Sequence, residues 1–147
     1  MNVLKENDLN SILIEFRKRT EILGSILFTS DGFIIALDQG VLENDSDMHQ
    51  SLGAVCAGIA SLAGNGVEII DENNKINQIS VQAGNQLEHD GFQILIESVA
   101  DDILLAIIFP ISANYGVIQF ELKQIVSKLK TYFISISKDK ALEILKT

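Results

Sequence analysis

The strongest constraint on the fold is a stretch of nineteen residues, 48–66 (MHQSLGAVCAGIASLAGNG), that contains no Asp, Glu, Lys or Arg. Its apolar residues recur at helical spacing, and a helix on the surface of a soluble protein needs a polar face. One apolar stripe suits a sheet: Met48, Leu52, Val55, Cys56, Ile59 and Ala63. The rest of the circumference is small and uncharged, so a second surface should cover it: Gly53, Ala54, Ala57, Gly58, Ala60, Ser61 and Gly64.

Three interpretations of this helix remain open. A membrane span needs about twenty strongly apolar residues, whereas His49, Gln50, two serines and several glycines dilute this segment. The helix could also be buried within its own subunit. We favour packing against a second copy or a partner, because glycine inside a helix costs about 0.5–1 kcal/mol relative to alanine and close approach compensates for it. On this interpretation, a charge placed at Ala57 separates the two chains.

Composition limits the class of protein. A chain of 147 residues is in the usual range of a single domain, and 47% hydrophobic with 21% charged residues excludes disorder as a starting point. The single cysteine, Cys56, cannot form an internal disulfide, and no Cys/His cluster has the spacing of a metal site. Residues 1–20 lack the pattern of a signal peptide. We therefore expect a cytoplasmic protein without cofactor or metal.

The charge is negative and uneven. The net charge of −9 would repel phosphate backbones, and no basic stripe offsets it, so nucleic acid is not an expected partner. From Asp38 to Asp102 there are twelve acids against one base, Lys75, while the flanking segments hold ten bases and eight acids. One surface of the protein should be clearly acidic.

Periodicity and turn signals predict three helices. The first has an apolar stripe with Asn7 or Asp8 available as a cap. The second begins with a capping box formed by Asp47 and Gln50 and ends at about Gly66. The third begins near Tyr115, and the β-prone segment 131–137 is the weakest part of it. The stripes of the first and third helices are Leu9, Ile12, Leu13 and Phe16, then Ile118, Leu122, Ile125, Leu129, Tyr132 and Ile136.

Five strands are predicted at about 23–29, 33–38, 76–83, 91–98 and 103–109, with an Asp31-Gly32 turn between the first two. The order α-β-β-α-β-β-β-α indicates an α+β fold, a five-stranded antiparallel sheet sandwiched by helices. The second helix takes one face, and the first and third helices take the other. The strands 23–29 and 103–109 are apolar on both faces and belong in the middle of the sheet.

The strand at 76–83 presents Gln78, Ser80 and Gln82 on one side, which fits an edge position. An exposed edge is a site for pairing with another chain. A twofold dimer can join this strand and the small-residue helix face to their own copies in one interface. The predicted interface therefore combines these three residues with the seven small residues named above.

The sequence contains few candidates for catalytic groups. His49 and His89 are forty residues apart and are expected at the surface or in capping roles, and Cys56 is expected in the core. The acids at 71–72 and 101–102 are expected in turns, as is Asp31. No nucleophile elbow, zinc-protease motif or phosphate-binding loop is present, and residues 64–66 (GNG) fit the end of a helix. We therefore predict that the chain is not an enzyme.

Three segments together resemble the Roadblock family, which includes dynein light chains. Residues 24–36 (GSILFTSDGFIIA) resemble the family's two strands around an Asp-Gly turn, the small-residue helix is similar to its second helix, and residues 114–118 (NYGVI) resemble the entry to its last helix. The resemblance covers about residues 9–134. Its boundaries indicate a Roadblock-like domain at 1–137 and a C-terminal extension at 138–147.

The resemblance implies a profilin-like sandwich that dimerises through the second helix and the third strand, as a homodimer or with a related Roadblock chain. It also implies a non-catalytic scaffold or regulator that binds Ras-like small GTPases. Since polar residues and glycines dilute the second helix, we expect no insertion into a membrane. The acidic loop 39–46 and the C-terminal extension depart from the family pattern. A light chain of a motor complex and a small-molecule sensor of PAS-like or GAF-like outline are the alternative functions.

Overall fold

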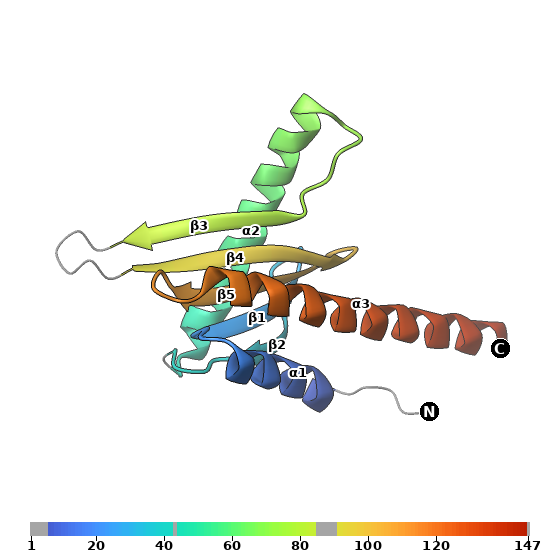
Figure 1. Ribbon diagram of the computed structural model, residues 1–147. Helices are drawn as coiled ribbons and strands as arrows, with labels where there is room; N and C mark the ends of the chain where they lie inside the picture. The colour runs from blue at the N-terminus through green and yellow to red at the C-terminus, as the bar shows by residue number, and fades with distance from the viewer. Residues whose placement is uncertain (1–5, 43, 85–90, 147) are drawn as a thin grey trace.

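The computed structural model describes the backbone of residues 6–42, 44–84 and 91–146, and the side chains of residues 8–136 within those ranges. Three helices and five strands follow one another in the predicted order (Figure 1). The bounds are α1 Glu6–Arg19, β1 Gly24–Thr29, β2 Ile34–Asp38, α2 Ser46–Ile70, β3 Gln78–Gly84, β4 Gly91–Ala100, β5 Ile103–Pro110 and α3 Tyr115–Lys146. The predicted α+β class is confirmed.

All five strands form one antiparallel sheet in the order β2-β1-β5-β4-β3. The strands β1 and β5 are buried along most of their length, because helices cover both of their apolar sides. In β3, exposed and half-buried residues alternate, as expected of an edge strand. The positions predicted for the central strands and for the edge strand are confirmed.

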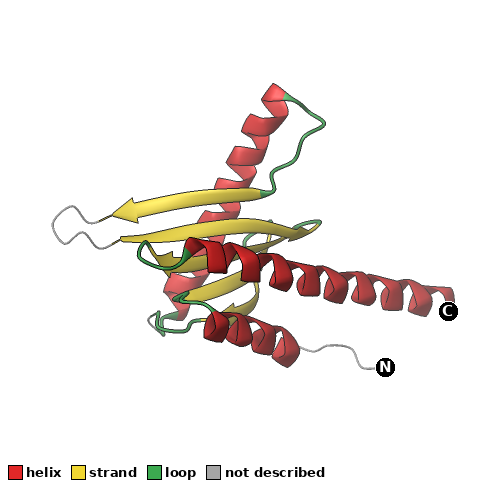
Figure 2. Cartoon of the chain, in the orientation of Figure 1, coloured by secondary structure: helices red, strands yellow, loops and turns green. Residues whose placement is uncertain are grey.

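Helices cover both faces of the sheet, with α1 and α3 on one face and α2 on the other (Figure 2). The larger core lies under α1 and α3 and contains Leu13, Phe16, Leu105, Leu122 and Leu129, each at most 3% exposed. A smaller core lies under α2 and contains Ile26, Phe28, Cys56, Ala57, Ile96 and Ala106. The layer order is the one that the sequence predicts.

The second helix begins earlier than predicted. Asp45 is the N-cap, and its Oδ1 accepts hydrogen bonds from the backbone N–H groups of Asp47 and Met48 at 3.1 and 3.2 Å. Asp47 lies within the first turn, where its negative charge interacts favourably with the helix dipole. The capping box predicted at Asp47 is therefore wrong by two residues.

The second helix also ends later than predicted. It continues through residues 64–66 to Ile70, so the interpretation of GNG as a helix end is wrong. The backbone N–H of Asp71 donates to Val67 O at 2.9 Å and closes the last turn. The Asp71 carboxylate then accepts a hydrogen bond from the N–H of Asn73 at 3.0 Å, which turns the chain toward β3.

The other two helices differ from expectation mainly at their ends. α1 begins at Glu6, so neither Asn7 nor Asp8 is its cap. α3 is one helix through the β-prone segment 131–137, since Tyr132 is 6% exposed and packs in the larger core. The division between a domain at 1–137 and an extension at 138–147 stays a prediction.

The two edges of the sheet differ in how they are protected. At the β2 edge, Asn10 Oδ1 of α1 accepts a hydrogen bond from the backbone N–H of Leu37 at 3.4 Å. Arg17 of α1 forms an ion pair with the buried carboxylate of Asp38 at 2.6 Å. At the other edge, β3 pairs only with β4 among the described strands. The sheet therefore has one guarded edge and one open edge.

Candidate interaction surface

Three large apolar side chains lie in a row on the outer side of α2. Val55, Leu62 and Ile69 are spaced by seven residues, and their exposed fractions are 57%, 74% and 87%. A spacing of seven places residues on the same side of a helix, as in the seam of a coiled coil. We call these three residues the α2 outer row. An exposed apolar row of this kind makes the outer side of α2 a candidate interaction surface.

The predicted small-residue face of α2 divides into two parts. Gly53 and Ala57 are buried against the chain's own sheet, and a Cβ on Gly53 would lie 3.4 Å from Gly32 O. Ala57 is 6% exposed and belongs to the smaller core. These two residues contact the sheet of their own subunit.

The other small residues of α2 are open to solvent to differing degrees. Ala54, Gly58 and Ser61 are exposed, whereas Ala60 and Gly64 are half-buried. A Cβ on Gly58 or Gly64 would find no atom within 4 Å among the described residues. Gly58 lies three residues from Val55 and four from Leu62, so it leaves space beside the α2 outer row. Their role in an interface stays a prediction.

Val55 was assigned by sequence to the sheet-facing stripe, and its exposure of 57% shows that this is wrong. The other members of that stripe are buried or half-buried. Because both sides of this helix are uncharged, periodicity alone does not show which side faces the sheet. The spacing of seven from Val55 to Ile69 is the sequence signal that indicates the outer side.

The open edge of the sheet carries the predicted polar row. Gln78, Ser80 and Gln82 are exposed and point to the α3 side of the sheet, since they pair with Glu97, Leu95 and Gln93 of β4. Gln93 Nε2 donates a hydrogen bond to Ser80 Oγ at 2.6 Å. Between them, Ile79, Val81 and Ala83 are half-buried and point to the α2 side. The edge is thus polar on one side and apolar on the other.

A polar network connects the start of β3 to α3. Gln78 Nε2 donates to Glu97 Oε2 at 2.9 Å, and Gln119 Nε2 donates to Gln78 Oε1 at 3.2 Å and to the Tyr115 hydroxyl at 2.6 Å. These contacts hold the Gln78 side chain against its own subunit. Among the described strands, the backbone of β3 pairs with β4 alone, so its outer edge has no strand beside it in this part of the chain.

Glu97 of β4 is a titratable group that pairs with Gln78 of this edge. Partial burial raises the pKa of its carboxyl group, while the hydrogen bond from Gln78 and the charges of Lys130 and Lys123 lower it by less. The folded protein then holds this proton in a pH range where the unfolded chain has released it. Burial of this carboxylate therefore costs stability as pH rises through that range.

Glu97→Gln is expected to remove this cost, because an amide has no proton to lose and its oxygen still accepts a hydrogen bond from Gln78. The free energy of unfolding of the wild type should fall relative to that of the variant as pH rises from about 4 to about 7. Urea denaturation at both pH values measures this difference. Glu68→Gln, at an exposed position of α2, is the control, and parallel pH profiles of wild type and Glu97→Gln would contradict the prediction.

The remaining titratable candidates do not form a catalytic group. Cys56 is buried as predicted, and burial raises the pKa of its thiol. His49 is 2% exposed, so the prediction of a surface role is wrong: its side chain lies against the protein, whereas Ser46 and Asp47 of the same turn are exposed. His89 lies outside the described residues. Within the described part of the chain, no group of three or more His, Cys, Asp or Glu side chains could hold a metal ion.

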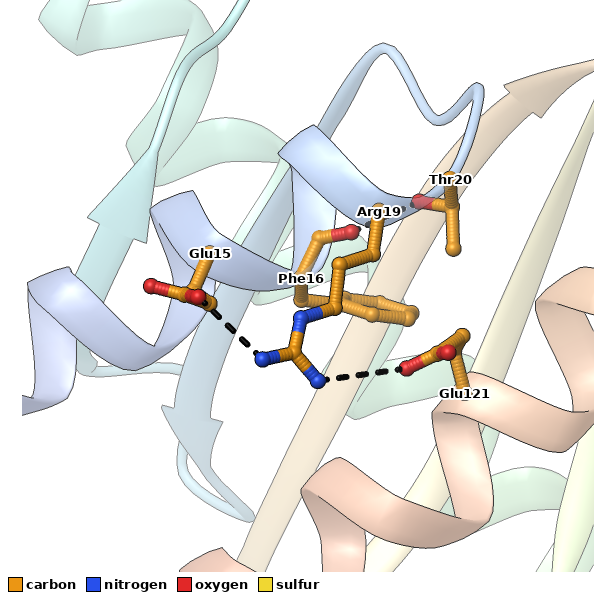
Figure 3. A network of polar contacts seen from close by, with 5 residues as sticks. All are labelled: Glu15, Phe16, Arg19, Thr20 and Glu121. Atoms are coloured by element: carbon orange, nitrogen blue, oxygen red, sulfur yellow. Dashed lines mark hydrogen bonds and ion pairs between the residues drawn. The ribbon is translucent and has the colours of Figure 1, made fainter.

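On the opposite face, a polar network joins α1 to α3 (Figure 3). Arg19 contacts Glu15 of its own helix at 3.2 Å and Glu121 of α3 at 4.0 Å. These three residues line an open hollow of about 350 Å³ between the two helices, whose floor includes Phe16 and Ile125. Since the Arg19 side chain is 52% exposed, we expect these ion pairs to contribute little to stability.

By length and composition, α2 could also cross a membrane, and only 17% of its most apolar window is buried. Its inner side nevertheless supplies Cys56 and Ala57 to the smaller core, so insertion would remove these residues from the sheet. The outer side of the helix carries the exposed α2 outer row. The prediction of no membrane insertion is not tested by this geometry.

No family model and no curated protein matches the amino-acid sequence. Solved structures match the fold. A Roadblock/LC7 domain from Streptomyces avermitilis has a TM-score of 0.73 at 16% identity, covering 85% of this chain and 97% of that one. MglB from Myxococcus xanthus has a TM-score of 0.76 at 17% identity, covering 92% and 94%. A structure described as MglB with tetrameric arrangement has a TM-score of 0.69 at 17% identity, covering 83% and 85%.

These likenesses extend over most of this chain and nearly all of the first two neighbours, and the element order agrees with the motifs that resemble the Roadblock family. The predicted profilin-like sandwich is therefore confirmed at the level of the fold. The chain has a Roadblock/LC7 fold.

Proposed function

We propose that this protein is a symmetric dimer built through the α2 outer row and the open edge of β3, and that the dimer is a non-catalytic scaffold for a small GTPase. The observation that carries the proposal is the pairing of these two features on one side of the molecule. The apolar residues of β3 point to the face that α2 occupies, and α2 extends past β3 (Figure 1). A single contact with a second copy can cover both.

The asymmetry of the sheet edges supports a closed dimer. The β2 edge is guarded by Asn10 and Arg17 of α1, so a second copy cannot add there without displacing that helix. Pairing of β3 with the β3 of another copy is antiparallel about a twofold axis and leaves no further open edge. A sheet with one open edge therefore gives a dimer rather than a fibre.

Covering the α2 outer row is energetically favourable. Burial of a large aliphatic side chain is worth about 1.5–3 kcal/mol, and each copy contributes three such side chains that are more than half exposed. Gly58 leaves space beside the row, so the backbones of the two helices can approach closely. In this arrangement the partner of α2 is a second protein helix and not a lipid bilayer.

The role as a GTPase scaffold is supported by the fold and by the Roadblock resemblance in the sequence. The structural neighbours include MglB and a domain named Roadblock/LC7, and MglB is also described in a tetrameric arrangement. The segment from Asp38 to Asp102, with twelve acids and one base, includes α2 and the strands next to it. In a dimer the negative charge of this segment is doubled and can steer a basic partner. We place this scaffold in the cytoplasm.

Two measurements test the proposal. Light scattering on a sizing column should give twice 16.1 kDa, and a mass of one chain at every concentration would exclude the homodimer. Small GTPases from the same genome are then titrated in both nucleotide states at low and high ionic strength. We expect one to bind, more weakly at high salt, and with altered nucleotide exchange or hydrolysis. If none binds in either state, the dimer stands and the GTPase is excluded.

A further inference from the structure

The open edge of the sheet lacks the features that usually keep edge strands from pairing. Such strands are commonly protected by lysine, proline or a bulge. The seven residues of β3, Gln78–Gly84 (QISVQAG), include no charged residue and no proline, and their pairing with β4 is continuous. In a chain of net charge −9, an uncharged edge places no like charges opposite one another when two copies meet there. The edge is therefore suited to a second copy of this chain.

The backbone groups of β3 alternate between β4 and the open edge. The N–H of Ser98 donates to Asn77 O at 3.2 Å, so residue 77 turns its backbone groups toward β4. At the other end, the N–H of Ile111 donates to Gly91 O at 3.0 Å, so Gly91 turns toward β5 and the residue it pairs with, Gly84, turns away from β4. Both groups of one residue point the same way, and successive residues alternate. The outward residues are therefore Gln78, Ser80, Gln82 and Gly84.

A twofold axis limits the ways in which these outward residues can pair. Two antiparallel copies bond through outward residues only when one residue of β3 lies on the axis, because even-numbered residues must then face even-numbered ones. With Val81 on the axis, every outward residue of the described strand has a partner. With Ser80 on the axis Gly84 has none within the strand, and with Gln82 on the axis Gln78 has none. The backbone therefore favours Val81 at the axis.

The side chains on the α2 side of the edge fit the same register. Val81 then faces Val81 of the second copy, and Ile79 faces Ala83 of the second copy, so that a large side chain meets a small one. These three residues are half-buried within one subunit. With Ser80 on the axis, Ala83 would instead face Asn77, and a polar residue would interrupt an apolar row.

On the α3 side, the register brings a donor to an acceptor. Ser80 Oγ accepts a hydrogen bond from Gln93 Nε2 at 2.6 Å, so the hydroxyl can donate its own proton to another group. Gln82 of the second copy lies directly opposite Ser80 in this register, and its Oε1 can accept that proton. The twofold axis makes the contact twice.

Gly84 also fits this arrangement. A Cβ placed on it would find no atom within 4 Å among the described residues, and its φ is not positive, so the described part of its own subunit does not require a glycine there. Glycine in a strand often marks the close approach of another backbone. Opposite Gly84 lies Gln78 of the second copy, whose side chain bonds to Glu97 and Gln119 of its own subunit. The glycine leaves room for this side chain.

We propose that β3 pairs with β3 of a second copy of this chain with Val81 on the twofold axis, and that the contacts between Ser80 and Gln82 hold this register. Since the facing residues are complementary pairs from one sequence, the partner that fits this edge is a second copy. The register rests on the proposed dimer and is independent of the proposed GTPase.

Cross-linking between single cysteines measures the register directly. Across a non-hydrogen-bonded pair the two Cα atoms are about 4.5 Å apart, within the range of a disulfide. Val81→Cys should therefore form an intermolecular disulfide under copper phenanthroline about ten times faster, or more, than Ser80→Cys or Gln82→Cys, since residues 80 and 82 are about 8–9 Å from their own copies in this register. Cys56 is buried, so the wild type should remain uncross-linked. Free thiols are blocked before the chains are separated on a non-reducing gel.

The outcomes of this experiment separate the register from the dimer. If Ser80→Cys or Gln82→Cys cross-links fastest and light scattering shows a dimer, the dimer stands and Val81 is not on the axis. If none of these variants cross-links although the protein is dimeric, β3 is not the contact. A wild type that is monomeric at every concentration overturns the dimer and the register together.

A double-mutant cycle tests the contact between Ser80 and Gln82. Ser80→Ala and Gln82→Ala should each raise the dissociation constant of the dimer about tenfold, because the twofold axis doubles the lost hydrogen bond. The double variant should be no weaker than either single variant, since both substitutions remove the same contact. Sedimentation equilibrium measures these constants, and circular dichroism verifies that the variants are folded. Losses that multiply to about a hundredfold in the double variant, or no loss in any variant, would overturn the role of these two residues.

Discussion

Ala57→Glu is expected to destabilise the subunit itself, with a loss in the free energy of unfolding of about 3 kcal/mol or more. Ala57 is 6% exposed and packs with Ile26, Phe28 and Ala106 in the core under α2. A carboxylate there loses its hydration and finds no basic group among the described residues of that core. At about 4 °C per kcal/mol for a chain of this length, the melting temperature should fall by more than about 10 °C.

Thermal melting followed by circular dichroism measures this loss. Ala54→Glu places the same charge three residues earlier on the same helix, at an exposed position, and should change the melting temperature little. The sequence alone predicts a different result for Ala57→Glu, a folded protein separated from its partner copy. A variant that melts like the wild type but is monomeric would restore that earlier interpretation and contradict the packing of α2 described above.

Most of the fold could be predicted because its signals are local or strongly periodic. The strands β1 and β5 are apolar on both sides, which indicates a central position irrespective of the rest of the chain. The predicted Asp31-Gly32 turn between β1 and β2 is confirmed by the left-handed conformation of Gly32, with φ of 93°. In β3 the alternation of polar and apolar residues identifies both the strand and its place at the edge.

The ends of helices and the burial of polar residues were predicted less well, because they depend on tertiary contacts. Glycines at 64 and 66 usually indicate a helix end, but α2 continues to Ile70 and stops where the Asp71 carboxylate begins a turn. His49 resembles a surface residue in sequence and is 2% exposed in the structure. The angle at which α2 crosses the sheet determines this burial, and no local pattern encodes that angle.

The candidate surface was predicted correctly in its elements but not in its orientation. A helix whose two sides are both uncharged has no polar residue to indicate which side faces solvent. The sequence therefore predicts Val55 in the core and Ala57 in the interface with a partner, whereas in the structure Val55 is exposed and Ala57 is buried.

Leu62→Glu is expected to convert the proposed dimer to a folded monomer. Leu62 is 74% exposed in the single chain, so the subunit does not need it to fold. In a twofold interface each substitution appears twice, and two buried carboxylates without partners cost several kcal/mol. The dissociation constant of the dimer should rise on the order of a thousandfold or more.

Sedimentation equilibrium over a range of concentrations measures this constant, and circular dichroism verifies that the variant is folded. Ile134→Glu is the matched control, because Ile134 is an aliphatic residue with 57% exposure on α3, away from the α2 outer row. It should leave the dimer intact. Ala57→Glu and Leu62→Glu, on different sides of α2, should therefore have different effects. Ala57→Glu should lower the stability of the subunit, whereas Leu62→Glu should remove association while the subunit stays folded. If Leu62→Glu remains as dimeric as Ile134→Glu, the α2 outer row is not the interface, and the open edge of β3 would have to hold the two copies together without it.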